Sequence, residues 1–68
     1  MEEINFDIKY VIPMTFLSDN TIRKVQCSIK EINHFMIKVT SLEEGYDDLY
    51  FVDHHFKWLL YTGYITKL

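Results

Sequence analysis

Alanine is absent from this chain, and cysteine, proline and glycine are scarce, with one Cys, one Pro and two Gly in 68 residues. The single cysteine, Cys27, excludes an intramolecular disulfide and a zinc site assembled from several thiolates of one chain. Two glycines are too few for the glycine-rich loops that hold phosphates. No apolar run exceeds four residues, far below the roughly 20 of a membrane-spanning helix. We therefore expect neither such a helix nor a signal peptide.

The composition indicates a packed globule, because 49% of the residues are hydrophobic and 16% are aromatic. The length predicts one domain, residues 1–68. A core of this size rarely supplies more than about 3 to 5 kcal/mol, so a second subunit is the stabilising element to expect. With one unpaired cysteine and no export signal, the expected compartment is the reducing cytoplasm.

Residue usage also hints at the source. The absence of alanine beside many Ile, Lys, Tyr and Phe residues is what AT-rich codons would give. This association favours a low-GC bacterium or one of its phages, where a small accessory or inhibitory protein of a phage or mobile element would fit the size.

Apolar residues alternate with polar ones in the first part of the chain, a period of two that predicts β-strands. The alternating sets are Ile4, Phe6, Ile8, Tyr10, Ile12, Met14 and Phe16; Val25, Cys27 and Ile29; and Phe35, Ile37 and Val39. Pro13 interrupts the first strand and cannot donate to a ladder, so this strand is expected at an edge of the sheet.

Two short turns are predicted between these strands. A two-residue turn at Asp19-Asn20 sets Ile12 opposite Cys27, and a three-residue loop at 31–33 sets Cys27 opposite Ile37. Both registers place all apolar sets on one face, as a three-stranded antiparallel meander requires.

The spacing changes to 3.6 residues after Asp47 or Asp48, which predicts a C-terminal helix. Its apolar stripe is Leu49, Val52, Phe56, Leu59 and Leu60. Gly63 is expected to end the helix, with the next two residues folding back on the last turn. In the alternative interpretation, residues 49–52 form a short fourth strand and a shorter helix is capped by Asp53. The predicted fold is α+β, a β-β-β-α arrangement with or without that fourth strand.

A second apolar side of the helix suggests an interaction surface. Its residues are Phe51 and Trp58, spaced by seven, flanked by His54, His55 and Tyr61. A helix that is apolar on two sides must be covered on both, either by the tail at 64–68 or by another subunit or protein. We expect a non-enzymatic protein interaction module, a homodimer in its simplest form, that contacts its partner through Phe51, His54, Trp58 and Tyr61.

The outer face of the predicted sheet provides the alternative hypothesis, binding of nucleic acid or another polyanion. The residues that would carry it are Lys9, Lys24, Lys30, His34 and Lys38. The predicted registers set Lys9 opposite Lys30, and Lys30 opposite His34, a row of like charges that an anionic partner would relieve. The other interpretation is a solvated face that discourages aggregation. The net charge of -3 and the absence of aromatic residues on this face argue against nucleic acid.

Catalytic and metal-binding patterns are weak. Cys27 is expected in the core as an inert thiol, and the acidic pairs at 43–44 and 47–48 have no deep pocket to enclose them in so small a domain. Adjacent His54 and His55 would point about 100° apart on a helix, unlike the i, i+4 pair of a helical zinc motif. We expect no enzyme, no cofactor and no metal site.

Overall fold

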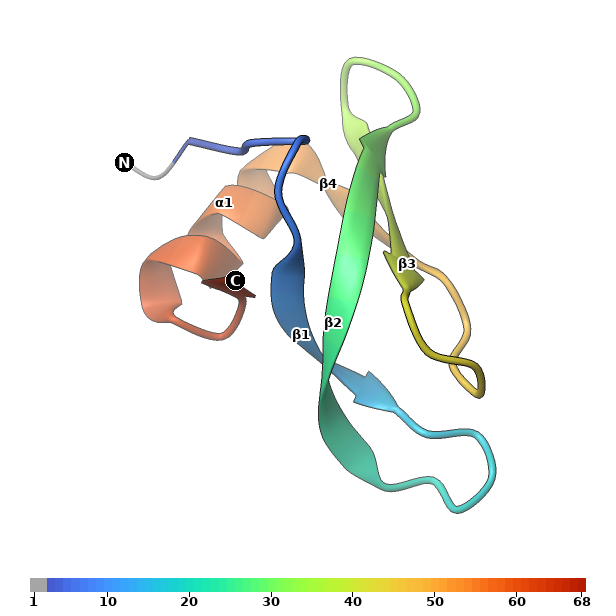
Figure 1. Ribbon diagram of the computed structural model, residues 1–68. Helices are drawn as coiled ribbons and strands as arrows, with labels where there is room; N and C mark the ends of the chain where they lie inside the picture. The colour runs from blue at the N-terminus through green and yellow to red at the C-terminus, as the bar shows by residue number, and fades with distance from the viewer. Residues whose placement is uncertain (1–2) are drawn as a thin grey trace.

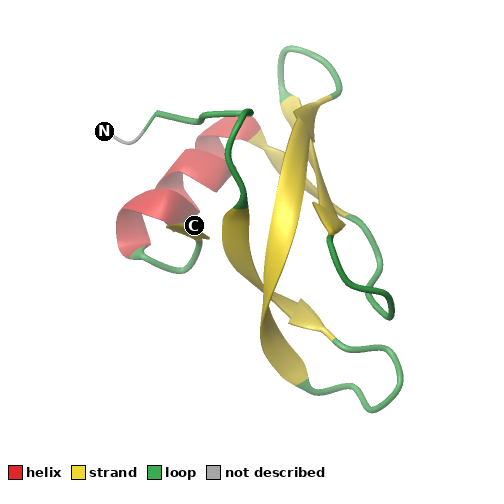
Figure 2. Cartoon of the chain, in the orientation of Figure 1, coloured by secondary structure: helices red, strands yellow, loops and turns green. Residues whose placement is uncertain are grey.

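The computed structural model describes residues 3–68, which form one antiparallel sheet with a helix on one face (Figures 1 and 2). The elements are β1 (Tyr10–Thr15), β2 (Ile22–Glu31), β3 (Met36–Ser41), β4 (Leu49–Val52), α1 (Asp53–Thr62) and β5 (Thr66–Lys67). The strand order is β4-β3-β2-β1-β5. The predicted α+β class, a meander followed by a C-terminal helix, is confirmed.

The core lies between the inner face of the sheet and α1. Its buried side chains are Tyr10, Ile12, Met14, Val25, Cys27, Ile29, Ile37, Val39, Phe56, Leu60 and Ile65. The Tyr10 ring meets the Phe56 ring edge-on, with centroids 5.4 Å apart, a favoured aromatic geometry. The period-two strands and the helix thus bury their apolar residues against each other, as the sequence pattern indicates.

The predicted faces are correct, but both predicted registers are wrong. Cys27 lies opposite Tyr10, not Ile12, and opposite Ser41, not Ile37. Each shift is an even number of residues, so the inward set stays inward. Alternation determines which face a residue occupies, whereas the turns determine its partner, and both turns differ from the predicted ones.

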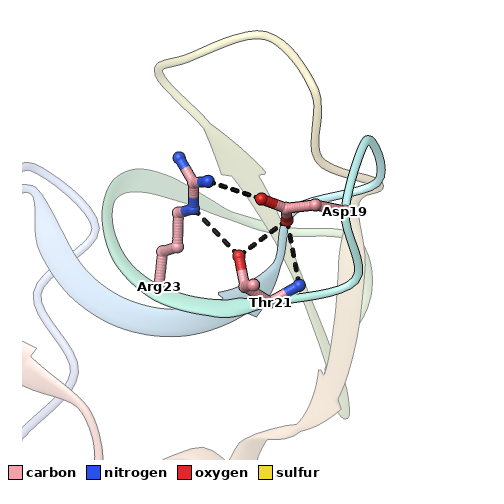
Figure 3. A network of polar contacts seen from close by, with 3 residues as sticks. All are labelled: Asp19, Thr21 and Arg23. Atoms are coloured by element: carbon pink, nitrogen blue, oxygen red, sulfur yellow. Dashed lines mark hydrogen bonds and ion pairs between the residues drawn. The ribbon is translucent and has the colours of Figure 1, made fainter.

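The first turn is longer than the predicted two-residue turn and is held by side chains (Figure 3). Asp19 accepts hydrogen bonds from the backbone amide and the hydroxyl of Thr21, at 3.0 and 2.7 Å, and pairs with Arg23 at 2.8 Å. The hydrogen bonds from Thr21, aided by Arg23, hold the pKa of Asp19 below its usual value. Asn20 adopts the left-handed conformation with φ 60°, as its side chain allows.

The second turn is also wider than predicted. The Asn33 side chain accepts from the amides of Phe35 and Met36 at 2.9 and 3.1 Å, and the amide of Ile32 donates to the carbonyl of Met36. Phe35, predicted to be a core residue, therefore lies in the turn and is 68% exposed. An Asx-type turn has replaced the first inward position of the predicted third strand.

The first strand is shorter than the alternation predicts. It begins at Tyr10, and residues 6–8 form turns and a bend before it. Ile4 and Ile8 still pack against the core. The Tyr10 hydroxyl accepts from the amide of Asn5 at 2.9 Å and donates to its carbonyl at 3.1 Å. The hydroxyl of a buried tyrosine usually has a hydrogen-bond partner, and these two bonds hold Asn5 beside Tyr10.

Residues 49–52 form β4, so the alternative interpretation is confirmed and the longer helix is wrong. Leu49 and Phe51 face inward and are half-buried, whereas Tyr50 and Val52 face outward. Pairing with β3 over four residues overrides the helical spacing, which the short apolar run did not distinguish from a strand. No side chain caps the start of α1; Asp53, the predicted cap, is its first residue.

The helix ends as predicted, at Gly63 with φ 84°. The amide of Gly63 donates to the carbonyl of Leu60 and that of Ile65 to the carbonyl of Leu59, both at 3.1 Å. This return buries Ile65 and leads into β5, an unpredicted strand whose two residues pair with Tyr10 and Val11 of β1. No helix within residues 3–68 is long and apolar enough to cross a membrane.

Cys27 is fully buried, and its thiol donates weakly to the thioether of Met14 and the carbonyl of Val25, both at 3.3 Å. Burial, with a smaller contribution from Glu43, raises the pKa of this thiol to about 11. The thiol is therefore neutral near pH 7 and packs as a small apolar side chain.

Candidate functional site

The most distinctive exposed feature is the side of α1 that points away from the sheet. A shallow hollow on it is lined by His54, Lys57, Trp58 and Tyr61, and we call these four residues the α1 surface. Their spacing of three, four and seven positions places them on one side of a helix, opposite Phe56 and Leu60 in the core.

Two aromatic rings dominate the α1 surface. Trp58 is 58% and Tyr61 is 71% exposed, and their rings stack with centroids 5.7 Å apart and planes inclined by 28°. Because each ring covers part of the other, the pair presents one preformed apolar platform. Exposed aromatic platforms of this kind are the anchors that protein interfaces favour.

The platform is uncovered in the described chain. Ile65 of the tail enters the core and β5 joins the far edge of the sheet, so residues 64–68 are committed elsewhere. Of the two predicted ways to cover the second side of the helix, the tail is therefore excluded for the single chain.

Phe51 does not belong to this surface, and its predicted place there is wrong. It lies in β4 and faces inward, with its ring centroid 5.9 Å from those of Phe56 and His55. The predicted spacing of seven from Trp58 assumed one continuous helix. The strand-to-helix junction at Val52 changes the period and turns Phe51 toward the core.

Lys57 is the basic residue of the α1 surface that is charged at neutral pH. Lys57 is half-buried and also lines a neighbouring hollow with Asp53, and His54 is exposed with its Nδ1 atom 3.8 Å from a carboxylate oxygen of Asp53. None of the four residues is acidic. Lys57 was missed by the sequence analysis, although its position three residues after His54 and four before Tyr61 carries the signal.

The predicted basic face is less concentrated than the alternative hypothesis requires. Lys30 lies opposite Lys38, not opposite Lys9 and His34, because the registers differ and His34 lies in the turn after β2. Lys24 is six residues along β2 from Lys30, roughly 20 Å away. Asp48 pairs with Lys38 at 3.5 Å, which removes part of the positive charge.

One aromatic side chain does lie on this outer face. Tyr50 of β4 is directly opposite Lys38 and is 55% exposed. The expectation that the face lacks exposed aromatic residues is therefore wrong, since it assumed a three-stranded sheet.

The thiol and the possible metal ligands do not form a reactive cluster among residues 3–68. Cys27, the thiol, is enclosed by the core. Within residues 3–68, no three His, Cys, Asp or Glu side chains lie close enough together to hold a metal ion.

Comparison with models of protein families, with curated proteins and with solved structures found no match to this chain. Its function is therefore inferred from its own surface.

Proposed function

We propose that this protein is a non-enzymatic protein–protein interaction module that acts as a homodimer and binds another protein through the α1 surface. The observation that carries this proposal is the stacked Trp58–Tyr61 pair, exposed on a helix whose opposite side is packed in the core. Burying two such rings would recover apolar area at little cost in side-chain entropy, because the pair is already ordered.

The chemistry of the α1 surface indicates the kind of partner. Lys57 and His54 border the rings, and the Asp53 carboxylate lies beside them, outside the hollow that holds the rings. A partner segment that presents an apolar side chain to the rings and an acidic group to Lys57 would complement both features. We therefore favour an acidic, partly apolar protein segment as the ligand.

Replacing Trp58 with alanine tests this proposal. Wild-type chain and the Trp58→Ala variant are used to capture proteins from host extract, and each candidate is then purified and its Kd measured by calorimetry. We expect the variant to bind the purified partner at least about 30-fold more weakly, the loss typical of a hot-spot aromatic residue.

Tyr64→Ala is the matched control, because Tyr64 is 52% exposed but lies beyond the helix and outside the α1 surface. It should retain the wild-type Kd. Equal binding by wild type and Trp58→Ala, or the absence of any purified protein that binds the wild type, would refute the proposal.

Binding of a polyanion through the outer sheet face is the second candidate, supported by the Lys30–Lys38 pair beside Tyr50. It predicts affinity for duplex or single-stranded DNA that falls steeply with salt, since each neutralised phosphate releases counterions. Lys30→Gln should flatten the salt dependence, whereas Lys24→Gln, at the far end of β2, should change it little. A titration at low salt without binding would eliminate this candidate.

A further inference from the structure

The edge of the sheet formed by β4 has unpaired backbone groups. Hydrogen bonds between antiparallel strands involve every second residue. The amide of Asp53 donates to the carbonyl of Phe35 at 2.8 Å. The backbone N–H and C=O groups of Phe51, two residues earlier, therefore also point toward β3. Tyr50 and Val52 consequently direct their N–H and C=O groups away from β3. Among residues 3–68, only β3 pairs with β4.

The opposite edge of the sheet is protected. The amide of Phe16 donates to the carbonyl of Thr21. The backbone N–H and C=O groups of the even-numbered residues of β1 therefore point toward β2, and those of the odd-numbered residues point away from it. Of these, Val11 is paired with Thr66 of β5, Pro13 has no N–H to offer, and Thr15 is the last residue of the strand. A short covering strand and a proline are two of the means by which proteins prevent edge pairing.

The β4 edge has neither of these protections. Its sequence Leu-Tyr-Phe-Val contains no proline and no charge. The side chains of Tyr50 and Val52 lie on the outer face of the sheet and are 55% and 37% exposed. An exposed apolar edge strand with free donors and acceptors is a template for a further strand.

We propose that β4 pairs with β4 of a second copy, antiparallel about a two-fold axis at Phe51. In this register Tyr50 of each copy exchanges two backbone hydrogen bonds with Val52 of the other, and the two Phe51 side chains meet on the inner face. Every outward donor and acceptor of β4 is then satisfied, and aromatic side chains lie opposite β-branched ones, a favourable cross-strand pair. The inference locates the homodimer of the proposed function and does not depend on the α1 surface.

The acidic residues at both ends of β4 are already engaged within the chain. Asp48 pairs with Lys38, and Asp53 accepts the amide hydrogen of His54. The ion pair with Lys38 offsets part of the charge of Asp48 and so reduces its repulsion by the acidic residues of a second copy.

The helix leaves this edge free. It starts directly after β4 and ends near β1, where β5 pairs (Figure 1). Two copies joined at β4 would form one continuous ten-stranded sheet, with both helices on the same face because the two-fold axis is perpendicular to the sheet. Both α1 surfaces would point the same way, an arrangement suited to bivalent binding.

The variant Val52→Pro tests this dimer. Val52 has φ -70° and ψ 142°, angles that proline adopts without strain, and its N–H faces the open edge, so no internal hydrogen bond is lost. Sedimentation equilibrium of the whole chain at micromolar concentration should show a wild-type dimer, with dimer affinity about 30-fold or more lower in Val52→Pro because two intermolecular hydrogen bonds are removed. Val52→Thr keeps the N–H and the branched shape, and should remain dimeric.

Cysteine cross-linking provides a second measurement that does not depend on the proline variant folding. Tyr50→Cys and Val52→Cys chains, each with the apolar replacement Cys27→Ala in the core, should form a disulfide when mixed and oxidised, since the two positions lie opposite each other. A monomeric wild type, a Val52→Pro variant that dimerises normally, or a mixture that does not cross-link would overturn the inference. Trp58→Ala should still dimerise, so failure at the edge and failure at the α1 surface can be told apart.

Discussion

Replacing Phe56 with alanine should leave most of the chain unfolded at 25 °C. Phe56 is fully buried between α1 and the sheet, and its ring contacts those of Tyr10 and Phe51. Truncation of a buried phenylalanine costs about 3 to 5 kcal/mol, as much as a core of this size supplies. Urea unfolding followed by circular dichroism should show no folded baseline for this variant.

Two matched variants separate burial from a general effect of changing α1. Phe56→Leu keeps an apolar side chain in place and should cost roughly 1 to 2 kcal/mol. Trp58→Ala removes a larger ring two positions away on the exposed side, and should change the unfolding free energy by about 0.5 kcal/mol or less. A Trp58→Ala variant as unstable as Phe56→Ala would show that the assigned inner and outer sides of α1 are wrong.

Gly45→Ala should be much more damaging than Gly63→Ala, the other glycine-to-alanine change that this chain allows. Gly45 has φ +100°, and an added Cβ would lie 2.5 Å from Cε1 of Phe16. That ring is packed against Tyr46, with centroids 5.3 Å apart, and beneath the guanidinium of Arg23 at 4.1 Å. Backbone strain and overlap together should cost about 2 to 4 kcal/mol, measured as the shift in urea unfolding free energy.

Gly63 provides the control for this experiment. Its φ is +84°, but an added Cβ meets nothing within 4 Å, so Gly63→Ala should cost only the strain, about 1 kcal/mol. The difference between the two variants measures the overlap with Phe16. In a Phe16→Ala background, Gly45→Ala should cost about as much as Gly63→Ala; an unchanged large cost would show that Phe16 is not the cause.

The position of Gly45 explains why this contact matters to the whole fold. The amide of Leu17, just beyond β1, donates to the carbonyl of Gly45 at 2.9 Å. This hydrogen bond ties the projecting β1–β2 hairpin to the β3–β4 loop, two segments that lie near each other in Figure 1. Only a residue without a side chain allows the Phe16 ring to pack against the backbone here.

The candidate interaction surface was partly predictable. His54, Trp58 and Tyr61 share a helical period within α1, and the structure brings them together. Phe51 lies on the other side of the strand-to-helix junction, where the period of two applies instead. Short apolar runs such as residues 49–52 satisfy both periods, so the sequence pattern cannot distinguish them.

The basic outer face was less predictable, because its arrangement depends on strand register. Lys30 lies opposite Lys38 and not opposite His34. The side chain of Asn33 accepts hydrogen bonds from two backbone amides, and this turn makes the loop longer than predicted. A change of register by an even number of residues preserves the face of every residue but changes every cross-strand neighbour. Predicting which residues pair across two strands therefore requires knowing the geometry of the turn between them.

By itself, the sequence determined the α+β class, the inward residues within β1, β2 and β3 and the end of the helix at Gly63, because alternation and helical period are local properties. The predicted edge position of the first strand is wrong, since β5 pairs with Tyr10 and Val11 on its outer side; Pro13 itself lies beyond that short pairing. Tertiary structure decided the two registers, the strand state of residues 49–52, the return of the tail as β5 and the open β4 edge. Those features depend on which backbone groups find partners far along the chain, and local side-chain patterns do not specify those partners.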